Sequence, residues 1–153
     1  MGAKSKRKGN RNELELAKIL SKRFGREFSR SIGSGNRWSQ TSLNPDQSKV
    51  FAGDLVCPAG FRFAIECKAG YDEVNIFSLN QSAKIDMFLN QAVEDSVRCS
   101  KLPLLCWKQS RQPWIVFLKE EVQSPYQYRY GDWSVVLLDD LLGREEEFFY
   151  LAP

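Results

Sequence analysis

The stretch that decides the fold reads GDLVCPAGFRFAIECK, residues 53–68. Two apolar runs, at 50–56 and 61–68, flank a turn-forming sequence at 57–60, and this pattern predicts two neighbouring strands. Side chains alternate between the faces of a strand, so Glu66 and Lys68 share one face about 7 Å apart along the second strand. Asp54 ends the first run, and a hairpin folded near Gly60 brings it opposite Glu66.

Two carboxylates beside an ammonium indicate a definite chemistry. Asp54 and Glu66 offer the oxygen ligands that a hard cation such as Mg²⁺ prefers, and Lys68 can neutralise charge on a phosphoryl group. This set predicts a magnesium-dependent phosphodiesterase. An isolated Glu-x-Lys more often lies on a solvated face. A strand this apolar, however, carries Glu66 and Lys68 at a cost unless they are paired or bound to metal.

The composition excludes several classes of site. The chain has 153 residues, enough for one domain with a sizeable core, and it contains no histidine. Ser-His-Asp triads and histidine-ligated zinc are therefore excluded. The four cysteines show no C-x-x-C spacing, which argues against zinc and for a reducing cytoplasm. Without a long apolar run or a signal core, we expect a cytoplasmic protein, in the host if phage-encoded, with no membrane partner.

Positive charge is concentrated at the N-terminal end. Residues 1–38 hold eleven Lys and Arg against three acids, whereas the rest of the chain is net negative. A solubilising tail would also be basic, but this charge continues into a predicted helix and a glycine-rich loop, which favours nucleic acid. We expect residues 1–9 to form a mobile basic arm and residues 10–153 a single domain. The candidate phosphate contacts are Arg7, Lys8, Arg11, Arg30 and Arg37.

The remaining elements predict an α/β or α+β core with a mixed sheet. A helix is expected from Asn10 to Phe24, with Glu13 at the head of its inward stripe. There Glu13 can reach a catalytic pocket or simply favour the helix N-terminus. Other expectations are a short extended segment at 28–32, a long helix from about 78–80 to 98, a hairpin of 102–107 with 114–118, a strand at 135–138 and a helical turn at 139–142.

Taken in order, the motifs resemble the PD-(D/E)xK nuclease superfamily. More narrowly, they resemble the archaeal-type Holliday junction resolvases, which also occur in phages. The resemblance covers about residues 6–118, and Gly53 departs from it by standing where the name-giving motif has proline. Pro45-Asp46 lies too far upstream of Glu66 to replace it. The matching residues are Lys8-Gly9-Asn10-Arg11-Asn12-Glu13, Arg30, Gly33-Ser34-Gly35, Gly53-Asp54, Ile65-Glu66-Cys67-Lys68 and Asn80-Gln81, with Ile85 and Phe88 following.

The resemblance implies an α/β, restriction-endonuclease-like core and a role for each matching residue. Mg²⁺, for which Mn²⁺ substitutes, would be held by Asp54, Glu66 and the backbone carbonyl of Cys67. Glu13 would bind a second ion or a metal-bound water. Lys68 would orient the attacking water or neutralise phosphoryl charge, and Gln81 would steady the site. Ser34 would lie on a DNA-binding loop. The implied substrate is a four-way DNA junction, nicked in pairs by a homodimer.

Three alternatives remain open. A restriction-like or repair nuclease would keep the same catalytic residues and cut duplex or flapped DNA. A ribonuclease is possible as well, because phosphate chemistry alone does not distinguish the sugars. A non-catalytic DNA-binding protein with a decayed nuclease fold is less favoured, since decay tends to remove costly buried charges and Asp54, Glu66 and Lys68 are all present. The role of residues 119–153 stays undetermined.

Overall fold

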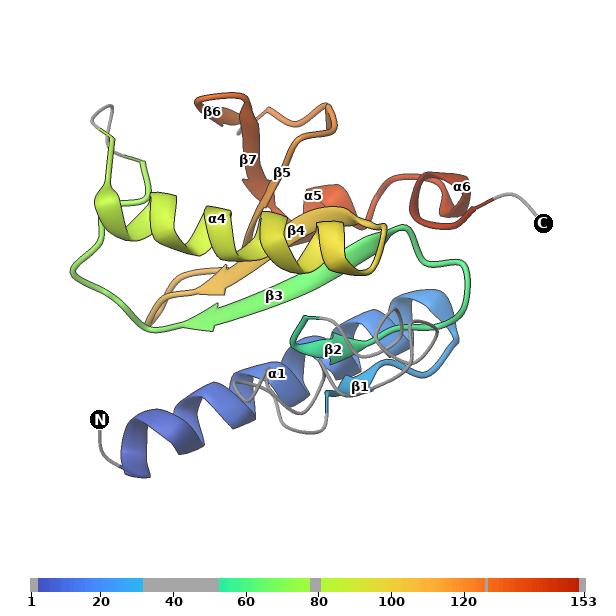
Figure 1. The fold of residues 1–153 in the computed structure, drawn as a ribbon, viewed down its shortest axis with the longest axis horizontal. Coiled ribbons are helices and arrows are strands. Elements are labelled where there is room, and N and C mark those ends of the chain that lie inside the picture. Colours follow the sequence, from blue (N-terminus) through green and yellow to red (C-terminus); the bar gives the residue numbers. More distant parts are fainter. Residues whose placement is uncertain (1–2, 32–52, 78–80, 126, 152–153) are drawn as a thin grey trace.

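The chain builds a five-stranded mixed sheet with a long helix on each face (Figure 1). The computed structural model describes residues 3–31, 53–77, 81–125 and 127–151, and for residues 3–10 only the backbone. The predicted α/β fold is confirmed, and it is consistent with a restriction-endonuclease-like core. The elements are α1 (Ala3–Phe24), β1 (Ser29–Arg30), β2 (Leu55–Val56), β3 (Phe63–Ala69), α4 (Ala83–Arg98), β4 (Leu102–Lys108), β5 (Ile115–Leu118), β6 (Tyr128–Tyr130), β7 (Trp133–Leu137), α5 (Leu138–Leu141) and α6 (Glu146–Phe149).

The strand order of the sheet is β3-β4-β5-β7-β6. β3 and β4 are parallel, because α4 carries the chain from the end of one strand back to the start of the next. β4 and β5 are antiparallel, which confirms the predicted hairpin, and β7 pairs antiparallel with both β5 and β6. β3 is therefore an end strand of this sheet, and its outer edge is available to the segment that precedes it.

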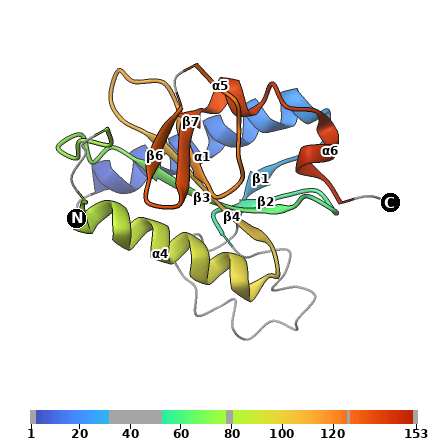
Figure 2. The ribbon, with the colours of Figure 1, turned by 90° about the horizontal axis from the view of Figure 1, so that it is seen from above.

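The two faces of the sheet pack on different helices. Alternation along β3 puts Phe63, Ile65 and Cys67 on the face that packs against α1. The opposite face, which includes Trp107 and Phe117, packs against α4. Figure 2 shows the two helices on opposite sides of β3. The buried residues contributed by the helices are Leu16, Leu20 and Phe24 from α1, and Ile85, Phe88 and Leu89 from α4.

Both long helices begin elsewhere than predicted. α1 starts at Ala3, not Asn10, so the helix includes residues 3–9, which were expected to precede it. The Lys- and Arg-rich sequence favours helix, and one internal glycine costs only about 1 kcal/mol. α4 starts at Ala83, because the side chain of Ser82 caps it by accepting from the amide of Ile85, and it ends at Arg98 as expected. None of the described helices is long and apolar enough to cross a membrane.

The predicted hairpin of residues 50–56 with 61–68 is corrected by the structure. β2 pairs antiparallel with β1, in register Leu55 to Arg30, and forms no regular ladder with β3 in the described part of the chain. The chain between β2 and β3 does not fold as a tight hairpin turn. Phe61, near its end, pairs with Tyr150 in an isolated β-bridge. Residues 50–52 lie outside the described residues. Among the described residues, the backbone hydrogen bond from this segment to β3 comes from Asp54, the residue before β2.

The C-terminal segment is part of the core, although its role was open at the sequence level and β6 and α6 were not predicted. The amide of Arg62 donates to the carbonyl oxygen of Phe149 at 2.7 Å, and the amide of Leu151 donates to that of Gly60 at 2.7 Å. The ring of Phe149 packs edge-on to that of Phe24, with centroids 4.8 Å apart. The last segment thus fixes the start of β3 against α1.

We expect Phe149→Ala to lower the free energy of unfolding by about 3–5 kcal/mol, because it deletes a fully buried ring. Phe149 is 1% exposed, whereas Leu151 is 67% exposed. Leu151→Ala is therefore the matched control and should change stability by less than about 0.5 kcal/mol. Urea unfolding measures both. Equal midpoints for the two variants would show that the C-terminal segment does not belong to the core.

Candidate active site

Asp54 is docked on the outer edge of β3 by two hydrogen bonds. Its backbone amide donates to the carbonyl oxygen of Ile65 at 2.8 Å. Its carboxylate oxygen Oδ2 accepts from the backbone amide of Cys67 at 2.7 Å. Both groups on β3 face the same edge because residues two apart on a strand present their backbone groups in the same direction. The Asp54 carboxylate is thereby fixed beside the residue that separates Glu66 from Lys68.

This docking requires glycine at position 53. Gly53 has φ of +88°, and a Cβ atom there would lie 2.7 Å from the carbonyl oxygen of Ile65. Proline is excluded because its ring holds φ near about −65°. The departure from the Pro-Asp motif therefore has a structural cause: the chain comes so close to β3 that only glycine fits.

β3 supplies the other groups of the site. Glu66 is 1% exposed and lies, with Lys68, on the face of the sheet that packs against α4. The backbone carbonyl of Cys67 points to the same edge as its amide, towards Asp54, because the two groups of one strand residue share a direction. The edge thus combines the carboxylate of Asp54 with a backbone carbonyl, and the Glu66 side chain adjoins it.

Glu13 approaches from α1 and is paired with Arg30. The guanidinium Nε of Arg30 donates to Glu13 Oε2 at 2.8 Å, and the Glu13 side chain is only 11% exposed. Arg30 is held in place by the pairing of β1 with β2, since its partner in the register is Leu55, the residue after Asp54. Arg30 was predicted to contact DNA phosphate. That role stays a prediction, and in this structure the Arg30 guanidinium is paired with the Glu13 carboxylate.

All three acids contribute to the electrostatics of one buried thiol, that of Cys67. Burial raises the pKa of the Cys67 thiol well above its ordinary value, and nearby Cys106, Asp54, Glu13 and Glu66 raise it further. Three acidic residues, each less than one-tenth exposed as a whole residue, thus act on one buried thiol. Arg30 and Lys68 supply two positive charges. Because concentrated buried carboxylates are costly unless compensated, this edge favours binding of a cation.

The oxygen donors at this edge suit a divalent cation that keeps several water ligands better than one bound by protein ligands alone. In the ranges that the structure describes, no three His, Cys, Asp or Glu side chains are arranged to hold a metal by themselves. Mg²⁺ usually keeps several waters and takes only one or two carboxylates from the protein. Asp54, Glu66 and the carbonyl of Cys67 are the groups that would hold it, and they are all oxygen donors.

The ammonium of Lys68 lies against an aromatic ring of α4. Its Nζ is 4.7 Å from the ring centroid of Phe88. Among the described residues, no acid forms an ion pair with Lys68. No sequence pattern indicated this contact, because Lys68 and Phe88 belong to separate elements of the fold.

The other predicted site residues are not brought to this edge by any described contact. Gln81 is exposed and directly precedes the cap Ser82, outside α4. Arg11 is exposed on α1. For Arg7 and Lys8 the structure describes the helical backbone alone, and Ser34 and Arg37 lie outside the described residues. The roles predicted for these six residues stay predictions.

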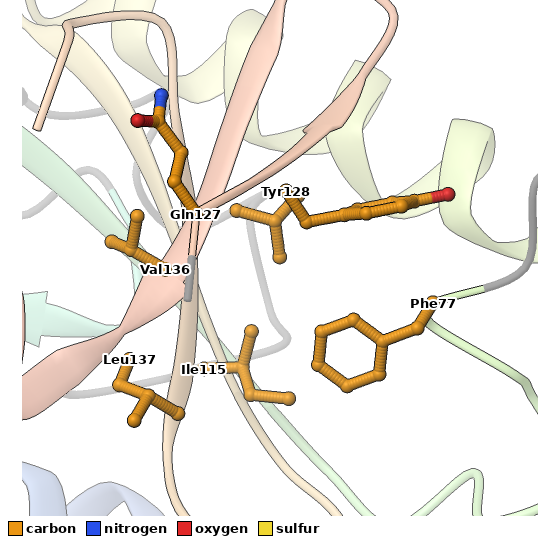
Figure 3. Close-up of a pocket in the computed structure, with 7 residues that line it drawn as sticks. Phe77, Ile115, Gln127, Tyr128, Val136 and Leu137 are labelled. Atoms are coloured by element: carbon orange, nitrogen blue, oxygen red, sulfur yellow. The ribbon is translucent and has the colours of Figure 1, made fainter. Parts of the chain in front are cut away.

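A separate hollow lies on the α4 face of the sheet, near β6 and β7. It has a volume of about 420 Å³ and is lined mainly by apolar side chains. Figure 3 shows the rings of Phe77 and Tyr128 at one side of it, with Ile115 and Leu137 opposite. Of the described residues that line this hollow, none is a predicted site residue and none is charged.

One comparison with known proteins identifies a family. A family model described as "Phage putative PDDEXK endonuclease" matches residues 4–138, which is most of the chain and includes Glu13, Asp54, Glu66 and Lys68. Comparison with curated proteins and with solved structures gave no significant match.

We expect Gly53→Ala to displace Asp54 from β3. A methyl group at 2.7 Å from the Ile65 carbonyl cannot be accommodated, and φ of +88° is itself unfavourable for alanine. The combined loss of stability should be about 3 kcal/mol. Gly131→Ala is the control, because Gly131 also has positive φ, +59°, but a Cβ there meets nothing within 4 Å. Gly131→Ala should lower the free energy of unfolding by about 1 kcal/mol.

Amide hydrogen exchange followed by NMR locates the effect. In Gly53→Ala the Cys67 amide should exchange much faster, since its acceptor is Asp54 Oδ2, while amides between β4 and β5 keep their protection. Unchanged protection of Cys67 would contradict the docking described here.

Proposed function

The chain belongs to this family of phage PDDEXK endonucleases, and from that premise we propose that it is a Mg²⁺-dependent endodeoxyribonuclease that resolves four-way DNA junctions. The observation that carries the proposal is the hydrogen bond from the Cys67 amide to Asp54 Oδ2 at 2.7 Å. It brings an acid from before β2 to the strand that carries Glu66 and Lys68. No other group of described residues combines buried acids with a lysine in this way.

Each residue at this edge has a role in the proposed reaction. Asp54, Glu66 and the carbonyl of Cys67 would hold the metal, which when bound supplies an activated water and charge neutralisation for phosphodiester hydrolysis. Lys68 would donate to a non-bridging phosphate oxygen and stabilise the negative charge that develops there. Glu13 already accepts a hydrogen bond from Arg30, so we propose that it contributes negative charge to the site and binds a second ion only if that pair opens.

The preference for junctions is supported by the order and spacing of the sequence motifs, whereas the family match supports a nuclease without specifying the DNA structure. Resolution needs two cuts related by a two-fold axis, so we propose a homodimer acting on DNA in the cytoplasm. The N-terminal concentration of Lys and Arg supplies attraction to the DNA backbone. Cutting of duplex or flapped DNA is the alternative that the experiment distinguishes.

The test is cleavage of an end-labelled synthetic four-way junction, beside matched duplex, flap and single-strand substrates. We expect paired symmetric nicks in the junction with Mg²⁺ or Mn²⁺ and none with chelator. Asp54→Asn should lower kcat by at least about 10³-fold, because amide oxygen is a poor ligand for a hard cation. The variant should still bind DNA, since Asn can accept from the Cys67 amide and the basic surface is unchanged.

Asp139→Asn is the matched control, because Asp139 is an exposed acid on α5 that has no part in the site. It should cut at the wild-type rate. Cleavage of duplex or flaps with the same metal dependence would keep the nuclease site and replace the junction by the alternative substrate. Tight DNA binding without metal-dependent cleavage of any substrate would exclude a nuclease.

A further inference from the structure

The lysine of the candidate site has an unexpected neighbour. A lysine two positions from a glutamate on one strand face, with a second carboxylate at the adjacent edge, would ordinarily be expected to pair with an acid. Here the Lys68 ammonium lies instead 4.7 Å from the centroid of the Phe88 ring. We propose that Phe88 is a positioning residue for the reaction: its ring fixes the position of the Lys68 ammonium beside the metal-binding carboxylates. This inference rests on the proposed function.

Phe88 is well placed for this because its ring is buried and packed against two other rings. It is 2% exposed and projects from the middle of α4 onto the sheet. The ring of Tyr71 meets it edge-on with centroids 4.8 Å apart, and the ring of Trp107 does so at 5.2 Å. Trp107 is itself fixed, since its indole Nε1 donates to the carbonyl oxygen of Gly70 at 3.0 Å. The rings of Tyr71 and Trp107 thus orient the Phe88 ring beneath the Lys68 ammonium.

An aromatic ring is a different kind of partner from a carboxylate. The ring face attracts a cation through its quadrupole but carries no net charge, so it leaves the full positive charge available to a phosphate. A carboxylate partner would neutralise that charge and would also lose an oxygen that the metal needs. Lysine has a flexible stem with four carbons, so the ring limits the positions that its ammonium can take. The ring therefore fixes the position of the cation beside the acids of the same site.

The neighbouring cation provides an internal control. Lys84, in the first turn of α4, places its Nζ 5.5 Å from the centroid of the Tyr71 ring. It belongs to the same aromatic cluster but does not contact Phe88 or the site acids in the described structure. Lys84→Met should therefore leave cleavage unchanged. Lys68→Met should lose at least about a hundredfold in kcat, since it removes a charge that acts at the phosphate.

The test replaces Phe88 by phenylalanines that carry one, two or three ring fluorines, introduced at that codon alone. Fluorine weakens the negative ring face and changes ring size little, so a cation–π contact should weaken in steps. We expect kcat for the DNA substrate to fall stepwise, by about tenfold across the series, with KM unchanged because only the position of Lys68 is affected. The kcat of Phe88→Leu should fall at least as far, and Phe88→Tyr should retain most of the wild-type kcat.

Phe117 is the control position for the same set of fluorinated phenylalanines. It is fully buried in the same core cluster, and no cation lies over its ring in the described structure. Fluorination there should leave kcat unchanged. A Phe88 series with constant kcat, in an enzyme that Lys68→Met inactivates, would overturn the inference and leave the proposed function standing. Absence of cleavage by the wild-type protein would overturn both.

An NMR measurement tests the contact without activity. The protons on Cε of Lys68 should resonate upfield of other lysines, because they lie over the Phe88 ring. The shift should vanish in Phe88→Leu and persist in Lys84→Met. Ordinary lysine chemical shifts for Lys68 in the wild-type protein would overturn the inference.

Discussion

The candidate site depends on the way Asp54 is held against the edge of β3. One hydrogen bond joins its backbone to Ile65, and a second joins its carboxylate to the amide of Cys67. These bonds fix both the position and the orientation of the acid. A slip of one residue would present the wrong backbone groups to Asp54, because successive residues of a strand face opposite ways. The close approach that prevents the slip is possible only because residue 53 is glycine.

The rest of the structure keeps β3 in position for this docking. α1 covers one face of the strand and α4 the other, and the C-terminal segment bonds to its start through Arg62. Glu66 is nearly inaccessible to water, which is unfavourable for a carboxylate, so the core contributes stability that offsets this cost. The Arg30 guanidinium pairs with the Glu13 carboxylate, and the Lys68 ammonium lies over the Phe88 ring. The carboxylate oxygens of Asp54 and Glu66 at this edge are of the ligand type that a divalent cation prefers.

Local pattern was enough to predict some of this arrangement. The alternation in 61–68 gave the two faces of β3 because it is a property of a few consecutive residues, and the hairpin of β4 with β5 followed from the same pattern. Pairings between distant segments could not be predicted. β2 pairs with β1, Glu13 with Arg30 and Lys68 with Phe88, and each depends on how separate elements pack. The start of α1 was misplaced because Gly9 and Asn10 resemble a boundary that the surrounding Lys and Arg override.

The most direct test of the account is divalent-cation binding by the folded protein without DNA. Mn²⁺ titration followed by electron paramagnetic resonance should show a bound ion in the wild type. Asp54→Asn should weaken that binding by at least about tenfold, and Asp139→Asn should leave it unchanged. Equal Mn²⁺ affinity in wild type and Asp54→Asn, or no bound Mn²⁺ in the folded wild type, would contradict the claim that Asp54 docked on β3 forms the metal site.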